Sequence, residues 1–554
     1  MRGILTIILC MMFVASAGAV VQIVEFCPDP YLHDDADEYI VLSGYGPLDD
    51  ITISDNHGGF RFPPGIRLQG SMTVARNAHA YEQSHGRLPD FEWLDYSPDV
   101  PNVINGDPLR LANAKDELVL YEKGSVVQKI SWPEDVKPRE GQVHYLEGGT
   151  WDRRVLMTGQ SRFSTEVFRN VSVTTFVSPD CSNEVYSDTI EHASRTILVN
   201  MYEFSSPAMG DSLIAAKSRG VDVRVLIEGG PVGGISPAEK SLIWNINRSG
   251  IPVVSMVSSK TEHAPYRYDH AKYVVIDNNS LLITSENFKN TGFPPEGMSG
   301  NRGWGVYLKD PALAGYFSEV YTTDTSSKSV VSYTGSAGDP EPAPFEKHTA
   351  EFSPAHFEGA AVTPVISPDT SYQIMDLLGS ARTSIEIEQA YIKNETPYTL
   401  NPYLSSAINA SRRGVRVRVL LDSFWFNTEG PNDNDEMAAL INRIGASEHI
   451  PLEAKCIDLS VSPVEKIHNK GVIVDDERVL ISSINWNSNS PTFNREAGVI
   501  IEHPGVARYF HEVFDDDWNP MANMARPKTD FVKLAIVALV FLFLLVIYFR
   551  RRNR

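Results

Sequence analysis

The first part of the chain alternates short apolar runs with turn residues. Val20–Phe26 opens the series, and seven further apolar runs follow: Glu38–Leu42, Ile51–Ile53, Phe60–Phe62, Met72–Ala75, Leu109–Leu111, Glu117–Tyr121 and Val126–Ile130. Glycine, proline and aspartate separate these runs, and no helical period is present. Strands of this length at this spacing predict a β-sandwich over residues 20–150. No cluster of residues in it suggests catalysis, which favours an adhesive or spacing module with an unknown ligand.

From about Ser178 the pattern changes and then repeats itself. Ser178-Pro179-Asp180 recurs as Ser367-Pro368-Asp369, and Arg219–Glu228 recurs as Arg413–Asp422. Each copy alternates helix and strand, with a glycine after the helix to supply the left-handed residue at its end. This alternation predicts an α/β sheet with helices on its faces. The copies, residues 170–335 and 345–525, are expected to pack about a pseudo-twofold axis.

Each copy ends in a hairpin that carries the candidate chemistry. The offsets from histidine to lysine, aspartate, serine and asparagine are equal in the two copies, which read His270, Lys272, Asp277, Ser285 and Asn287, then His468, Lys470, Asp475, Ser483 and Asn485. Apolar runs between these positions predict buried strands, whose alternation sends histidine and lysine to one face. Pseudo-twofold packing would bring two imidazoles, two ammoniums and two carboxamides together as a phosphate site.

The paired His-x-Lys-x-x-x-x-Asp motifs with trailing serine and asparagine resemble the phospholipase D superfamily, over roughly Ser178 to Trp518. The resemblance implies that a phosphodiester is cleaved or transferred through a phosphohistidine, without a metal ion or cofactor. One neutral imidazole attacks phosphorus, and the other, protonated, supplies the leaving alcohol with a proton and then activates water or an acceptor alcohol. The lysines neutralise the phosphate, while the asparagines and serines donate hydrogen bonds to it.

Glu496 distinguishes the second copy from the first. It occupies a position where superfamily members often place a glutamate that hydrogen-bonds the nearby histidine, whereas the first copy has Gly303 there. Such a partner fixes the imidazole tautomer and raises basicity at the other nitrogen. His468 is therefore expected to be the base or nucleophile and His270 the acid, although the first histidine is often the nucleophile in two-motif relatives.

Other positions near the motifs allow two interpretations each. Asp277 and Asp475 end their strands, so each is as readily a turn residue that bonds the backbone as a catalytic group. The loops after two repeat strands are expected to rim the site. One, Glu228–Gly234, is small and flexible, whereas Phe424–Phe426 is aromatic. These aromatics could touch acyl chains, and buried packing is at least as good an interpretation.

The β-rich region also carries a resemblance. The segments Asp37–Leu42, Phe62–Gly65 and Asp116–Leu120 resemble a lamin-tail domain. That resemblance implies an immunoglobulin-like sandwich. The expected architecture is therefore multidomain: this sandwich, the duplicated phospholipase D-like fold, and a C-terminal transmembrane helix.

Both ends of the chain carry targeting signals. Residues 1–19 combine a positive start, an apolar stretch and small residues, which predicts a secretory signal. The nearly uninterrupted apolar stretch 531–549 predicts a membrane span. The arginine-rich tail 550–554 is then expected in the cytoplasm by the positive-inside rule. The bulk of the chain is accordingly expected outside the cytoplasm, anchored to the cell membrane.

The charge and the predicted anchor favour one substrate class. A net charge of -21 disfavours a non-specific nucleic-acid binder, which needs clustered lysine and arginine. A phospholipid-like substrate is favoured because the catalytic module would stand beside a bilayer. A secreted metal-independent nuclease and a non-enzymatic surface adhesion protein are the alternatives. The sequence leaves open hydrolysis or transfer, the oligomeric state, and the disulfide state of Cys27, Cys181 and Cys456.

Overall fold

A computed structural model describes residues 21–520, apart from 56, 114, 133–138, 153, 259–262, 345, 397 and 431–432. The secretory signal predicted over residues 1–19, the span predicted over 531–549 and the tail 550–554 lie outside the described residues. Within the described part, none of the helices combines the length and apolarity needed to cross a membrane.

The N-terminal region forms two mainly antiparallel sheets around a shared apolar core. The larger sheet contains β1 (Gln22–Cys27), β2 (Tyr39–Pro47), β5 (Arg67–Ala75), β6 (Phe91–Glu92), β10 (Gln142–Glu147), β11 (Thr150–Trp151) and β12 (Leu156–Met157). The smaller contains β3 (Ile51–Ser54), β4 (Gly59–Arg61), β7 (Ile104–Asn105), β8 (Asp116–Glu122) and β9 (Ser125–Trp132). A predominantly β domain is thus present, while its lamin-tail assignment stays a prediction.

Two details of this domain differ from expectation. The predicted strand Leu109–Leu111 is an irregular segment, although both leucines are buried in the core. A helix, α1 (Ala78–His85), was not predicted, and a short 3₁₀ turn, η1 (His33–Asp35), precedes it. The Asn77 side chain accepts a hydrogen bond from the Ala80 backbone N–H, and Gly86 closes the helix at φ +74°. Local capping therefore supports a helix that has no strong apolar period.

The duplicated region builds a single 15-stranded sheet. The first copy contains β13 (Phe168–Ser178), α2 (Ser182–Glu191), β14 (Thr196–Met201), α3 (Pro207–Ser218), β15 (Asp222–Glu228), α4 (Pro237–Arg248), β16 (Val253–Met256), β17 (Lys272–Ile276), β18 (Ser280–Thr284), β19 (Gly303–Lys309), α5 (Pro311–Thr325) and β20 (Val330–Ser332). The second contains β21 (Ala355–Ser367), α6 (Gln373–Gly379), β22 (Ser384–Gln389), α7 (Pro402–Arg412), β23 (Arg416–Leu421), η2 (Trp425–Asn427), α8 (Asn434–Glu448), β24 (Leu452–Cys456), β25 (Lys470–Val474), β26 (Arg478–Ser482), β27 (Glu496–Glu502) and α9 (Pro504–Trp518).

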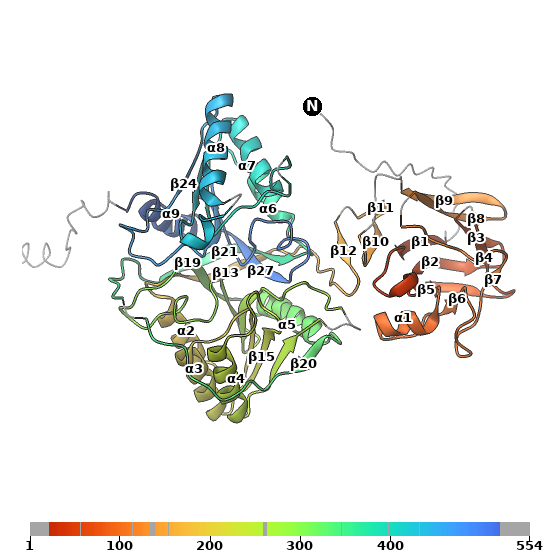
Figure 1. Cartoon of the computed structure of the whole chain (residues 1–554), viewed down its shortest axis with the longest axis horizontal. Coiled ribbons are helices and arrows are strands. Elements are labelled where there is room, and N and C mark those ends of the chain that lie inside the picture. Colours follow the sequence, from red (N-terminus) through yellow and green to blue (C-terminus); the bar gives the residue numbers. More distant parts are fainter. Residues whose placement is uncertain are drawn as a thin grey trace, which may run out of the picture.

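The strand order of this sheet shows the expected symmetry. It runs β20-β16-β15-β14-β17-β18-β19-β13-β21-β27-β26-β25-β22-β23-β24, so the copies meet where β13 pairs with β21. Figure 1 shows α2–α4 and α6–α8 in opposite lobes, with the N-terminal β domain to one side. The predicted hairpins β17–β18 and β25–β26 are confirmed as antiparallel pairs. Gly220 and Gly414 both end a helix at φ +96°, as predicted.

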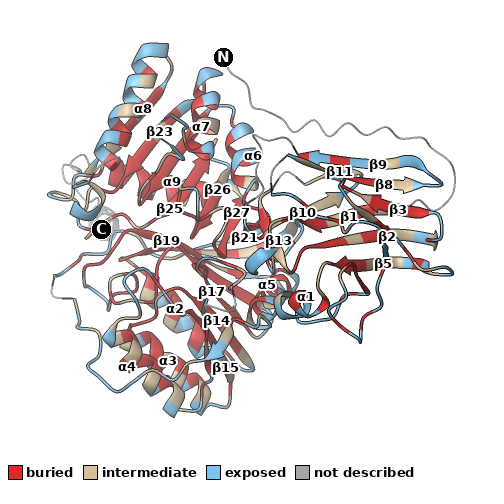
Figure 2. Cartoon of the chain, turned by 45° about the vertical axis from the view of Figure 1, so that its right-hand side comes forward, coloured by how far each residue is buried: buried red, intermediate tan, exposed pale blue. Residues whose placement is uncertain are grey.

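The buried core follows the central strands. Every residue of β17 and β25 is buried, lysines included, and Figure 2 shows the same burial along the middle of the sheet while the outer faces of the helices are exposed. Because both faces of these strands are buried, each carries a continuous apolar run after its lysine in place of an alternation of apolar and polar residues. Cys27, Cys181 and Cys456 are all free thiols.

Candidate active site

Each segment that carries a catalytic histidine forms a backbone hydrogen bond with the other copy. The His270 backbone N–H donates to the Arg495 carbonyl at 2.8 Å, and the His468 N–H donates to the Arg302 carbonyl at 2.9 Å. Each histidine is therefore backbone-paired with the opposite copy, at the residue that directly precedes Glu496 or Gly303. This exchange places each imidazole beside the other copy's side chains.

Two buried arginines hold these segments in place. Arg302 forms ion pairs with Asp180 at 2.9 Å and with Asp517 at 2.7 Å. The equivalent guanidinium of the second copy bonds one aspartate from each copy, since Arg495 meets Asp369 at 3.0 Å and Asp324 at 2.7 Å. Sequence reasoning missed these ion pairs. Their signal was available in the repeated Ser-Pro-Asp and Asn-Arg segments.

Glu496 contacts His270 and not His468, which corrects the expectation from sequence. Its Oε2 lies 2.7 Å from Nδ1 of His270, in hydrogen-bond geometry, and both side chains are buried. Ser483 Oγ donates to the same carboxylate at 2.6 Å, and Asn494 Nδ2 donates at 3.0 Å. Burial opposes ionisation, but the nearby His270 and these donors hold the pKa of Glu496 below its ordinary value.

Glu286 is the acidic neighbour of His468, and sequence reasoning missed it. Its Oε1 lies 3.3 Å from Nδ1 of His468. The residue sits between Ser285 and Asn287, where the second copy has Ile484. Burial raises the pKa of Glu286 to about 7, against the opposing effect of the Lys470 ammonium. A signal was present in the sequence. The first copy has Glu286 and Gly303, whereas the second copy has Ile484 and Glu496 at the equivalent positions.

The space for the Glu286 carboxylate exists because residue 303 is glycine. A Cβ at position 303 would lie 2.3 Å from Glu286 Cγ and 2.6 Å from its Oε1. Asn301 Nδ2 donates to Glu286 at 3.1 Å, as its equivalent Asn494 donates to Glu496. Glu286 thus places a carboxylate beside the imidazole of His468 from a position that is distant from residue 303 in the sequence and adjacent to it in space.

Burial lowers the basicity of both histidines. The pKa of His270 lies below its ordinary value because of burial, against the opposing charge of Glu496. Burial, together with the Lys470 and Lys466 ammoniums, holds the pKa of His468 well below its ordinary value. Both imidazoles are therefore neutral near pH 7 when no anion is bound. A phosphodiester beside the lysines would offset their charge and raise the basicity of both rings.

The lysines of the two motifs lie at the centre of the site. Lys272 and Lys470 are fully buried, and each ammonium donates to the backbone carbonyl of the histidine two residues before it. Burial lowers the pKa of Lys272 to about 8; burial and the Lys272 charge lower that of Lys470 to about 7. Two buried ammoniums, close enough for the charge of Lys272 to act on Lys470, favour an anionic ligand.

The asparagines and serines divide into two roles. Asn287 Nδ2 donates to Glu203 at 2.8 Å, and the side-chain oxygens of Asn287 and Asn485 are buried without a hydrogen-bond partner. These oxygens can only accept hydrogen bonds, so the carboxamides would bind an anionic ligand through their Nδ2 groups. Ser483 is committed to Glu496, and Ser285 Oγ accepts from the Trp304 N–H at 3.0 Å. The serines therefore shape the site from behind the imidazoles.

Asp277 and Asp475 lie at the opposite ends of their strands from the histidines. Asp277 accepts hydrogen bonds from the Ser194, Arg195 and Thr196 backbone N–H groups at 2.7–3.0 Å. Asp475 accepts in the same way from the equivalent backbone of the second copy. Both have positive φ, at 55° and 58°. The turn interpretation fits these contacts, since neither carboxylate reaches the imidazoles.

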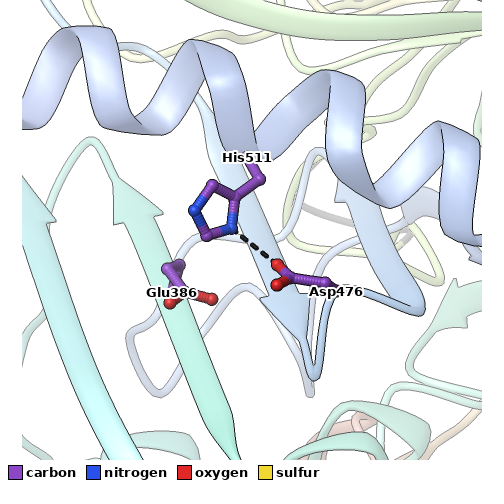
Figure 3. A group of neighbouring side chains, drawn as sticks. All are labelled: Glu386, Asp476 and His511. Atoms are coloured by element: carbon purple, nitrogen blue, oxygen red, sulfur yellow. Dashed lines mark ion pairs between the residues drawn. The ribbon is translucent and has the colours of Figure 1, made fainter.

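A second cluster of titratable side chains lies near Asp475. Glu386 on β22, Asp476 in the turn after β25 and His511 on α9 place ligand atoms within 4.8 Å of one another (Figure 3). His511 Nδ1 meets Asp476 at 2.6 Å, and its Nε2 meets Asp515 at 3.1 Å. Arg418 also contacts Glu386 at 3.3 Å. With both imidazole nitrogens engaged by carboxylates, the cluster acts as an ion-pair network that fastens α9 to the sheet.

Comparisons with known proteins agree with this geometry. The family described as "Cardiolipin synthase, PLD-like domain" matches residues 186–324 and 374–518, one segment in each copy. Cardiolipin synthase A of Cronobacter sakazakii is 23% identical over 342 residues, which cover 59% of this chain and 65% of that protein. The mitochondrial cardiolipin hydrolase of Chlamydomonas reinhardtii is 23% identical over 154 residues, 28% of this chain and 59% of that protein. The chain therefore spans about 60–65% of the length of these curated relatives.

Solved structures also show likeness to parts of the chain. The phosphatidylserine synthase of Haemophilus influenzae Rd KW20 matches with a TM-score of 0.46 and 14% identity, over 62% of this chain and 85% of that chain. The phospholipase D family member Nuc of Salmonella typhimurium matches with a TM-score of 0.25 and 24% identity, over 31% of this chain and 99% of that chain. Because the family match falls once in each copy and covers just over half of the 554 residues, this chain belongs to the phospholipase D superfamily, with the PLD-like domain of the cardiolipin synthase family.

Proposed function

We propose that the protein is a membrane-anchored phosphodiesterase or phosphatidyltransferase that acts on phospholipids through a phosphohistidine intermediate. The observation that carries the proposal is the convergence of two His-x-Lys units in which each imidazole Nδ1 faces a carboxylate, Glu496 at 2.7 Å from His270 and Glu286 at 3.3 Å from His468. Nδ1 of His270 is hydrogen-bonded to its carboxylate and Nδ1 of His468 faces one without a hydrogen bond, so Nε2 is the nitrogen that each ring offers to a substrate.

His270 is the nucleophile in this proposal, which reverses the assignment made from sequence. Its Nδ1–H donates to a carboxylate whose pKa is lowered, so Nε2 of the neutral ring is the more electron-rich. Nε2 attacks phosphorus, the bond to the leaving oxygen breaks, and protonated His468 gives that oxygen its proton. Water or an acceptor alcohol then gives a proton to His468 and attacks phosphorus, which breaks the P–N bond.

The lysines and asparagines bind the phosphate through both steps. Lys272 and Lys470 offset its charge, and the Nδ2 groups of Asn287 and Asn485 donate hydrogen bonds to its oxygens. The gain is large because these groups are buried, where electrostatic interactions are strong. A bound diester anion also favours the charged form of both lysines and the protonated form of His468, which the first step requires.

A phospholipid is the substrate class that the relatives and the predicted anchor support. Both curated relatives are named for cardiolipin, one as a synthase and one as a hydrolase. The predicted span at residues 531–549 would hold the catalytic region beside a bilayer. The net charge of -21 disfavours a polyanionic nucleic acid. Hydrolysis and transfer share the first step and differ only in the acceptor of the second.

The test uses the full-length protein in EDTA with two substrates, vesicles of phosphatidylglycerol and cardiolipin, and plasmid DNA. Release or exchange of lipid headgroups without DNA cleavage is the expected result, with added glycerol distinguishing transfer from hydrolysis. DNA cleavage without lipid turnover would establish the nuclease alternative and refute a phospholipid substrate. Inactivity on both, in protein with an intact fold, would favour the adhesion alternative.

The nucleophile is assigned by trapping the intermediate. Rapid quenching during turnover of a ³²P-labelled phospholipid, followed by peptide mapping under alkaline conditions, is expected to place the label on His270. The His468→Ala variant should still accumulate labelled His270 with a substrate whose leaving group needs no proton. Label on His468 in the unaltered protein would overturn the assignment.

A further inference from the structure

Three aromatic residues, half-buried Phe424 and exposed Trp425 and Phe426, form a turn after β23. Trp425 is 58% exposed and Phe426 is 73% exposed, which rules out the buried-packing interpretation for these two. The Trp425 ring lies 5.8 Å from Phe424 and 5.9 Å from Phe426, between ring centroids, so the three form one contiguous cluster. Adjacent exposed aromatic side chains of this size mark a contact surface more often than isolated exposed residues do.

This aromatic turn is fixed to the segment that carries His468. Asp422, two residues before Phe424, accepts a hydrogen bond from the Ile467 backbone N–H at 2.8 Å and another from Asn427 Nδ2 at 2.8 Å. The Lys466 ammonium lies 5.7 Å from the Phe424 ring centroid. The exposed rings therefore stand beside the residues that immediately precede the catalytic imidazole.

The equivalent loop of the first copy adds an exposed apolar residue on the His270 side. Glu228 accepts from the Asp269 backbone N–H at 2.6 Å, as its equivalent Asp422 does from Ile467. The Val232 N–H donates to the Tyr202 hydroxyl at 2.8 Å, and the Tyr202 ring lies 4.4 Å from the His270 ring. Val232 is 73% exposed. Exposed apolar side chains thus lie on loops that are fixed beside both catalytic histidines.

We propose that Trp425, Phe426 and Val232 form a membrane-docking rim that seats the mouth of the active site on a lipid bilayer. The inference rests on the proposed function, because the surface is continuous with a site for a phospholipid headgroup. Tryptophan and phenylalanine at the edge of a binding face are suited to the boundary between headgroups and acyl chains. Residues 519–530, between α9 and the predicted span, reach at most about 40 Å when extended, which limits how far the end of α9 can lie from that bilayer.

Apolar insertion, and not charge, drives the docking. The chain carries a net charge of -21, and Asp433 near the aromatic turn is already paired with Lys393 at 3.1 Å. An acidic protein gains nothing from anionic lipid through long-range attraction. Docking should therefore persist on zwitterionic phosphatidylcholine, and moderate salt should not weaken it.

The direct test is quenching of tryptophan fluorescence by brominated acyl chains, with the full-length protein in nanodiscs of brominated phosphatidylcholine. The unaltered protein should be quenched more strongly than the Trp425→Phe variant, because the variant lacks the tryptophan that reaches the brominated chains. Quenching that is unchanged by this substitution would overturn the docking rim and would fit a surface for a protein partner.

The functional test compares a bilayer substrate with bis(p-nitrophenyl) phosphate, a soluble diester that needs no docking. The double variant Trp425→Gln, Phe426→Gln should lose about tenfold or more in turnover of bilayer phospholipid and keep its turnover of the soluble diester. Val126→Gln is the matched control, because Val126 is 57% exposed on the N-terminal β domain, and it should change neither rate. Equal losses on both substrates, or no loss on the bilayer, would overturn the rim. If the unaltered protein turns over neither substrate, the proposed function fails and the quenching result alone decides docking.

Discussion

Glu286 Oε1 lies 3.3 Å from His468 Nδ1, and this contact between the copies is the counterpart of the one that joins Glu496 to His270. The two carboxylates come from different places in the repeat, one from the loop after β18 and one from the first residue of β27. A duplicated site has therefore kept the same chemistry at both histidines through different residues. That relationship leads to a substitution that restores the symmetry.

The first prediction concerns Glu286 and Gly303. Glu286→Gln replaces the titratable carboxyl beside His468 with a neutral carboxamide and is expected to lower kcat/KM on bis(p-nitrophenyl) phosphate by roughly 10²-fold, the scale of one acid–base contribution. Gly303→Glu alone should destabilise the fold, since the new Cβ would lie 2.3 Å from Glu286 Cγ. The double variant Glu286→Ile, Gly303→Glu rebuilds the arrangement of the second copy and should recover both stability and most of the activity.

Thermal unfolding and pH profiles of kcat/KM separate the possible outcomes of this swap. Glu286→Gln should leave the melting temperature nearly unchanged and alter the pH profile, because the residue acts through the imidazole. A role in folding alone would lower the melting temperature and leave the pH profile as it was. A double variant that folds but stays as inactive as Glu286→Gln would show that a carboxylate at position 303 cannot replace Glu286.

The second prediction is that the aspartates of the two motifs serve stability. Asp277→Asn and Asp475→Asn weaken the hydrogen bonds from three backbone N–H groups at each turn. Each should lower the free energy of unfolding by about 1–3 kcal/mol. The kcat/KM of the remaining folded protein should stay within about twofold. Chemical denaturation and active-site titration check this, and a large fall in kcat/KM at unchanged stability would restore a catalytic role.

Repeated local patterns are the part of the structure that the sequence predicted well. The hairpins β17–β18 and β25–β26 follow from apolar runs bounded by turn residues. Gly220 and Gly414 end their helices with left-handed geometry because residues with a Cβ are strained there. These features depend on a few neighbouring residues, and seeing each one twice removed most of the ambiguity.

Contacts between the copies were not predictable in the same way. Glu496 is nearer in sequence to His468 than to His270, yet Arg495 pairs with the His270 backbone and carries Glu496 to that imidazole. A pseudo-twofold arrangement allows each histidine to meet either copy's carboxylate, and sequence distance does not decide between them. The exposure of Trp425 and Phe426 likewise depends on how the turn packs, since aromatic residues in a loop are compatible with burial as well as with exposure.

The third prediction is an alkaline decline in activity caused by the buried lysines. Burial lowers the pKa of Lys470 to about 7 and that of Lys272 to about 8, so the free enzyme loses ammonium charge as pH rises through this range. Because kcat/KM reports the free enzyme, it should fall above about pH 7–8. Lys470→Arg keeps its charge and should move the decline to higher pH. A profile that stays level to pH 9 in the unaltered protein would contradict the prediction.

The fourth prediction concerns His511, which fastens α9 to the sheet away from the active site. Its hydrogen bond with Asp515 is the largest influence on the imidazole and raises the pKa of His511 to about 8, above the ordinary value of about 6.5. A raised pKa in the folded state means that the protonated form stabilises the fold. The contribution is complete below about pH 6.5 and is lost as pH rises through about 8. His511→Gln should therefore cost about 1–2 kcal/mol of unfolding free energy at pH 6 and almost nothing at pH 9. Urea denaturation of both proteins at several pH values measures this difference, and Asp515→Asn should remove most of the same dependence. A cost for His511→Gln that is equal at pH 6 and pH 9 would show that the imidazole contributes by packing and not by charge.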